Sequence, residues 1–260
     1  MKARLLIAAF AAVVTSMVAL PAAADRLDDV MNRKVIHIAV PTDYPPFGSV
    51  GSDMQPKGMD IDIAKLIAKD LGVELELVPV TSPNRVAYLQ TAKTDLTISS
   101  LGKTEERSKV IDFSIAYSPF FDAVFGTQNP PVKDFNDLAG KTIAVTRGTM
   151  QDKELQEVAP GATLQRFEDN NSTIAAFLSG QVGMFASGTG VAATIKQRNP
   201  TLDLELKIVL SNSPCYVGVA KGEARLLERV NTIIRKAKAS GEIDQLSRQW
   251  LGAPAGDLPE

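Results

Sequence analysis

The chain has 260 residues, of which 45% are hydrophobic, and its formal net charge at pH 7 is −2. The near balance of 28 basic and 30 acidic residues argues against nucleic acid or an anionic membrane as a partner. Cys215 is the only cysteine, which excludes an internal disulfide and argues against a metal cluster. The only histidine, His37, lies in an apolar run and is expected in the core, so the sequence predicts no Ser-His-Asp triad, no metal and no other cofactor.

Residues 1–24 have the pattern of a secretory signal peptide. Lys2 and Arg4 form a basic start, an apolar run covers residues 5–20, and small residues at 21–24 provide a cleavage site. We therefore expect the mature chain to begin near Asp25 and to reside in the periplasm.

The first part of the mature chain alternates strand and helix patterns. The apolar run 35–40 predicts a buried strand, and three prolines in residues 41–47 predict an irregular loop. Further on, the spacing predicts a helix over 60–71, a strand over 73–80, a helix over 84–91 and a strand over 95–99. This order implies parallel strands with right-handed crossovers.

The same alternation recurs later in the chain. Strands are predicted at 141–146, 163–167 and 182–186, helices at 151–158 and 172–178, and two C-terminal helices at 223–239 and up to Trp250. Two similar α/β lobes are therefore expected.

Four segments at predicted strand ends carry candidate binding residues, because ligands of open α/β sheets bind beyond the carboxyl ends of the strands. They are residues 43–47, 82–85, 99–107 and 147–149. Arg85 and Arg107 could each present a planar fork to a carboxylate, and the helix start at Gly148-Thr149 favours an anion. Tyr44 and Phe47 could form a contact wall. The simpler alternatives are solvated arginines and aromatic side chains that only pack their own loop.

Several motifs resemble those of the family 3 solute-binding proteins, the periplasmic receptors of ABC importers for polar amino acids. They occur in the family's order across the mature chain: Tyr44-Pro-Pro-Phe47, Gly58-Met-Asp-Ile-Asp-Ile-Ala64, Thr104-Glu-Glu-Arg107, Ile111-Asp-Phe-Ser114, Leu138-Ala-Gly-Lys141 with Gly148-Thr149, and Gly241-Glu-Ile243 with Trp250-Leu-Gly252. The resemblance implies a type II periplasmic binding protein fold, with two Rossmann-like lobes that close on a ligand. Lobe 1 would comprise residues 25–122 and 217–260, and lobe 2 residues 123–216. The crossings would lie near 121–124 and 213–216, and residues 217–260 would pack on lobe 1.

The resemblance also assigns binding roles. It implies that Arg107 binds a ligand α-carboxylate, helped by Ser100 and Gly102, and that Thr149 reaches the same group from lobe 2. Residues 81–85, with Ser82 and Arg85, are most similar to glutamate/aspartate-binding members, in which the matching arginine contacts an acidic ligand. Asn170 occupies the place of a ligand-contacting histidine in those members.

Gly188 departs from the family pattern, which places an aspartate there to pair with the ligand's α-ammonium group. Ser187, Thr189 or Asp169 could substitute, or the ligand could lack an amino group. With Arg147 expected beside Gly148-Thr149 at the cleft, the positive groups favour a ligand that is anionic overall.

The resemblance implies a non-enzymatic receptor that delivers a small carboxylate-bearing solute, such as a polar or acidic amino acid, to a membrane permease. A receptor for another organic anion is one alternative. The other is an enzyme on the same fold, a cyclohexadienyl dehydratase, for which Asp169 is the candidate general acid, although a capping role for Asp169 is the simpler reading.

Overall fold

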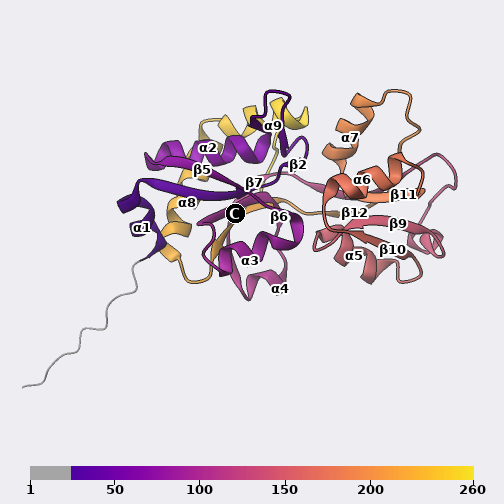
Figure 1. The fold of residues 1–260 in the computed structure, drawn as a ribbon, viewed down its shortest axis with the longest axis horizontal. Coiled ribbons are helices and arrows are strands. Elements are labelled where there is room, and N and C mark those ends of the chain that lie inside the picture. The colour runs from indigo at the N-terminus through magenta and orange to yellow at the C-terminus, as the bar shows by residue number, and fades with distance from the viewer. Residues whose placement is uncertain (1–24) are drawn as a thin grey trace, which may run out of the picture.

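A computed structural model describes residues 25–260 and shows two α/β lobes side by side along the long axis (Figure 1). The predicted signal peptide, residues 1–24, lies outside the described residues. The sheet of lobe 1 has the order β5-β1-β6-β13-β7. Its strands are β5 (Glu74–Pro79), β1 (Val35–Val40), β6 (Leu96–Gly102), β13 (Cys215–Ala220) and β7 (Ile111–Ser118). The strands β5, β1 and β6 pair in parallel, whereas β13 is antiparallel to both of its neighbours.

Lobe 2 is built on a second five-stranded sheet with the order β10-β9-β11-β8-β12. Its strands are β10 (Thr163–Phe167), β9 (Thr142–Thr146), β11 (Met184–Gly188), β8 (Phe121–Gly126) and β12 (Glu205–Asn212). The helices α5 (Met150–Val158), α6 (Asn170–Leu178) and α7 (Thr189–Arg198) pack on this sheet, and a short 3₁₀ turn covers Phe135–Leu138. The three parallel strands β10, β9 and β11 are the predicted second repeat, and β8 and β12 extend it by antiparallel pairing.

The C-terminal helices return to lobe 1, where Figure 1 shows them in yellow beside α2. The helices of this lobe are α1 (Arg26–Arg33), α2 (Met59–Leu71), α3 (Arg85–Gln90), α4 (Glu105–Ser108), α8 (Ala224–Ala239) and α9 (Glu242–Leu251), with a 3₁₀ turn at Ser82–Asn84. The indole of Trp250 on α9 donates to Asp62 of α2 at 2.9 Å, and Ile243 is buried. The apolar face of α9 therefore stabilises lobe 1. Among residues 25–260, no helix is both long and apolar enough to cross a membrane.

Three local predictions differ from the structure. The loop after β1 contains a two-residue strand, β2 (Asp43–Tyr44), which pairs with β3 (Gly48–Val50), itself paired with β4 (Pro56–Lys57). Pairing is possible because the prolines flank this dipeptide. His37 is not buried in the core: its side chain is 32% exposed, and Nε2 lies 3.1 Å from a Glu76 carboxylate oxygen on β5.

The crossing predicted at 121–124 lies inside β8, so the first connection between the sheets is Pro119-Phe120, and the second is Ser213-Pro214.

Candidate functional site

A cavity of about 20 Å³ lies between the lobes and is lined by residues of both; we call it the central cavity. Six of the predicted site residues line it: Tyr44, Ser82, Arg85, Ser100, Thr149 and Asn170. A space of this size holds roughly one water molecule, so any organic ligand requires the lobes to separate before it can enter.

Arg85 is almost completely buried and donates only to backbone carbonyls. Its guanidinium bonds the carbonyl oxygens of Ser82 at 3.0 Å and Ser99 at 2.9 Å, and across the cleft it bonds that of Gly148 at 3.2 Å. Burial lowers the pKa of Arg85, because the cation has lost its water and nearby groups such as Asp60 offset only part of that loss. Arg85 therefore stabilises lobe 1 through its bonds to backbone carbonyls, and it also presents a cation to the cavity.

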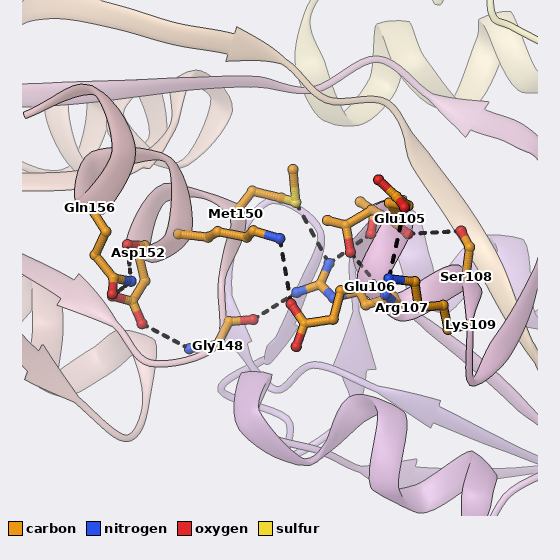
Figure 2. A network of polar contacts seen from close by, with 12 residues as sticks. Glu105, Glu106, Arg107, Ser108, Lys109, Gly148, Met150, Asp152 and Gln156 are labelled. Carbon is orange, nitrogen blue, oxygen red and sulfur yellow. Dashed lines mark hydrogen bonds and ion pairs between the residues drawn. The ribbon is translucent and has the colours of Figure 1, made fainter.

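Arg107, on α4, reaches across the cleft to the same carbonyl (Figure 2). Its Nη1 donates to the Gly102 carbonyl at 2.7 Å, and its Nη2 donates to the Gly148 carbonyl at 2.7 Å. Burial and the neighbouring cation of Arg85 lower the pKa of Arg107 to about 9. Within the described part of the chain, neither arginine forms an ion pair. Two guanidiniums therefore converge on one carbonyl oxygen with no carboxylate between them.

Other contacts hold the lobes together around the cavity. The Tyr44 hydroxyl lies 3.1 Å from the Ser187 hydroxyl and accepts from the Gly188 N–H at 3.1 Å. The Asp43 carboxylate accepts from the backbone N–H of Asn170 at 2.7 Å and from its side-chain amide at 3.1 Å. Tyr44, Ser187, Gly188 and Asn170 thus lie at one interface, where they bind the opposite lobe.

Thr149 caps helix α5 from the edge of the cavity. Its hydroxyl donates to the Thr146 carbonyl at 2.7 Å and accepts from the Asp152 N–H at 3.3 Å. Gly148 precedes it with φ of 72°, a conformation that suits glycine and turns its carbonyl toward the two arginines.

Seven predicted residues do not line the cavity. Arg107, Gly148, Ser187 and Gly188 make the contacts between the lobes described above, and the other three are Arg147, Phe47 and Gly102. The side chain of Arg147 is half exposed and bonds Glu168 at 2.7 Å, so it does not line the cavity. Phe47 is buried behind Tyr44, with ring centroids 5.9 Å apart, so it supports the wall without forming its surface. Gly102 contributes the carbonyl that binds Arg107, and a Cβ there would lie 2.6 Å from the Ser213 hydroxyl.

The ring of Phe120 explains why residue 188 has no side chain. A Cβ added to Gly188 would lie 2.5 Å from Cζ of Phe120, and Phe120 packs 5.1 Å from Phe47, centroid to centroid. The aromatic cluster therefore fills the space that a carboxylate on residue 188 would need.

We predict that Gly188→Asp lowers the free energy of unfolding by about 1–3 kcal/mol, since the new side chain must displace a packed ring. Denaturant unfolding measures this loss, and adding Phe120→Ala should recover part of it. Gly183→Asp is the matched control, because a Cβ at Gly183 meets no atom within 4 Å. Equal losses at positions 183 and 188 would contradict the steric explanation.

A buried carboxylate, Asp60, holds an irregular segment within β6, where the pairing with β13 shifts register. It accepts from the backbone N–H of Ser100 at 2.8 Å, from the Ser100 hydroxyl at 3.0 Å and from the Tyr117 hydroxyl at 2.7 Å. Ser100 has φ of 44°, and these bonds hold it in that conformation. Asp60 thereby fixes the segment of β6 whose carbonyls bind Arg85. The structure thus gives Ser100 a positioning role at the cavity edge.

The sequence reasoning missed Asp122 and Phe120, both of which line the central cavity. Asp122 is fully buried on β8, and its Oδ1 has no hydrogen-bond partner in the part of the chain that the structure describes. Burial, reinforced by the nearby Glu154, raises the pKa of Asp122 well above its usual range. An aspartate inside the otherwise apolar run 120–125 was the available signal.

Relatives of known type share this fold over most of the chain. The glutamine-binding protein of an ABC transporter from Bacillus subtilis is 29% identical over 87% of this chain and 85% of its own. A mutant of ArgBP from T. maritima is 32% identical with a TM-score of 0.81, covering 87% of this chain and 99% of that one.

A third relative is a precursor of an enzyme. The ancestral amino acid-binding protein AncCDT-1, a precursor of cyclohexadienyl dehydratase, is 31% identical with a TM-score of 0.79, covering 88% of this chain and 100% of that one. These likenesses confirm the predicted two-lobed fold, and none of the three names glutamate or aspartate. Since a family model matches residues 36–253, the chain belongs to the bacterial extracellular solute-binding proteins, family 3.

Proposed function

We propose that this protein is an extracytoplasmic receptor that binds an amino acid between its lobes by hinge closure and delivers it to the membrane permease of an ABC importer. The observation that carries the proposal is the pair of desolvated guanidiniums, Arg85 and Arg107, which share the carbonyl of Gly148 in place of an anion. A ligand carboxylate would give these cations the partner that the described chain does not provide.

Opening of the cleft would break the bonds of both arginines to Gly148 and leave the bonds of Arg85 and Arg107 within lobe 1 intact. The two guanidinium groups would then remain positioned on lobe 1 to bind the incoming carboxylate. Closure would bring the capped start of α5, with Thr149, over the bound group. Ser82, Ser100, Gly102 and Asn170 belong to this proposed site as residues that position it.

The charge of the cavity favours an amino acid over a dicarboxylate. The expectation of a ligand that is anionic overall counted Arg147 at the cleft and Gly188 in place of the expected aspartate. The structure turns Arg147 toward Glu168 and adds Asp122 to the cavity lining. A ligand carrying both signs of charge, as a free amino acid does, matches this arrangement better.

A thermal-shift screen of the twenty protein amino acids and 2-oxoglutarate tests the proposal. We expect at least one amino acid to raise the melting temperature, because a ligand at a hundredfold excess over its Kd stabilises by about 2.7 kcal/mol. Calorimetry then gives the affinity. The absence of binding by every amino acid would overturn the proposal.

A dehydratase is the second candidate, because Asp122 is a buried acid in the cleft and AncCDT-1 is a precursor of such an enzyme. The acid expected for this role, Asp169, caps α6 by accepting from the Ser172 N–H at 2.7 Å and from its hydroxyl at 2.9 Å. Incubation with prephenate or arogenate should give no aromatic product if the protein is a receptor. Multiple turnovers would establish the enzyme instead.

A further inference from the structure

Asp122 is a carboxyl group with no sufficient partner among residues 25–260. Its side chain is 0% exposed, and within that range Oδ1 has no hydrogen-bond partner and Oδ2 accepts only a long bond of 3.4 Å from the Ser211 hydroxyl. A buried carboxyl group normally has its hydrogen bonds satisfied, because leaving water without replacement is costly.

The surroundings of Asp122 add to this cost. The nearby acid Glu154 on α5 also has an unpaired buried oxygen, Oε2, and both side chains share Ser211 as a neighbour. Two acids therefore lie close together beneath α5, and of the two only Asp122 lines the central cavity. An unpaired buried carboxyl group that lines the central cavity is suited to bind a polar group of a ligand that enters the cavity.

The position of Asp122 defines what that group can reach. In the register of the second sheet, Asp122 on β8 lies directly opposite Gly188 on β11. Side chains of directly opposed residues project from the same face of the sheet. The side chain of Asp122 therefore lies on the face where Gly188 has none. The guanidinium of Arg85 belongs to the other lobe and bonds the Ser99 carbonyl of β6. The cavity thus has Arg85 on lobe 1 and Asp122 on lobe 2. The other acid in its lining, Asp43 on lobe 1, already accepts two hydrogen bonds from Asn170.

We propose that Asp122 is the residue that binds the ammonium group of an amino-acid ligand, with the ligand's carboxylate directed to the arginines of lobe 1. This inference rests on the proposed function and names its second recognition group. An ammonium group would donate to the unpaired Oδ1 and favour the ionised form of the carboxyl group, so each partner satisfies the other.

The test compares two probes that differ at the amino group. The amino acid that binds most tightly in the screen of twenty is titrated by calorimetry beside the 2-oxo acid with the same side chain, for example L-glutamate beside 2-oxoglutarate. The wild type should prefer the amino acid by about a hundredfold or more. Asp122→Asn should lose most of that preference, by weakening the amino acid about a hundredfold and the 2-oxo acid less than threefold.

Glu154→Gln is the matched control, since it changes the neighbouring acid that does not line the cavity, and we expect less than a threefold effect on either probe. The ligand-free Asp122→Asn protein should melt at or above the wild-type temperature, and Asp122→Ser serves if the asparagine variant does not fold. Equal loss of both probes, or no loss, overturns the role of Asp122 while the receptor function stands. A wild type that binds the 2-oxo acid as tightly as the amino acid also overturns it. A wild type that binds no amino acid overturns both.

Discussion

Arg107→Ala should weaken binding of an amino acid by about a hundredfold or more, because it removes a charged fork from the proposed carboxylate site. The melting temperature of the ligand-free protein should hardly change. Burial and Arg85 already lower the pKa of Arg107 to about 9, so the folded protein gains little from this cation. Calorimetry and thermal unfolding of the same samples measure both quantities.

Two further variants separate binding from structure. Arg107→Lys keeps the charge and loses the planar fork, so it should recover only part of the affinity. Arg85→Ala should weaken binding and also lower the free energy of unfolding by about 2–4 kcal/mol, because it leaves buried carbonyls such as those of Ser82 and Ser99 without a donor. Normal binding by Arg107→Ala, or a loss of several degrees in its ligand-free form, would show that Arg107 is structural.

Most of the fold could be predicted because its signals are local. The apolar run 35–40 is β1, and the spacing over 60–71 is α2 to within one residue, ending at Gly72 in the left-handed conformation. The helix α1 was missed, since its eight residues include only three apolar side chains. The short strand β2 was missed because prolines on both sides concealed a paired dipeptide.

The candidate site was predictable by segment and less so by side chain. Arg85, Ser100 and Thr149, which were predicted from strand ends, line the cavity. The direction of a side chain at such an end depends on contacts with distant residues, as Arg147 shows by pairing with Glu168. The placement of Asp122 depends on the register of β8 against β11, an antiparallel pairing between segments distant in the sequence that the sequence does not reveal.

The arrangement around Gly148 links the two lobes to the ligand. Its carbonyl accepts from both arginines only when the lobes are in contact, and the same contact places Tyr44 against Ser187. A ligand carboxylate that takes over the arginines must therefore compensate for the bonds to Gly148 as well as for its own desolvation. Affinity would then depend on how many of the remaining interlobe bonds re-form around the ligand.

Asp60→Ala should cause the largest loss of stability, about 3–5 kcal/mol in the free energy of unfolding. The carboxylate is 0% exposed and accepts three hydrogen bonds, so its removal leaves the Ser100 N–H and the Tyr117 hydroxyl without their acceptor. Denaturant unfolding at pH 7 measures the loss. Asp62→Ala, on the same turn of α2 with a side chain 22% exposed, is the control and should lose less.

Asp60→Asn should change the pH dependence of stability, with a sign fixed by the burial of Asp60. Burial raises the pKa of Asp60 from 3.8 to about 6. The unfolded chain ionises first as the pH rises, so this group stabilises the folded state least above pH 6, and its contribution falls between about pH 4 and pH 6. Asparagine does not titrate, so the stability of Asp60→Asn relative to wild type should increase by roughly 1–3 kcal/mol across that window. Unfolding free energies of both proteins at pH 4, 5, 6 and 7 give this difference directly, and the other titrating groups cancel from it. A difference that stays constant, or that decreases as the pH rises, would mean that the three hydrogen bonds outweigh burial and that Asp60 is ionised throughout.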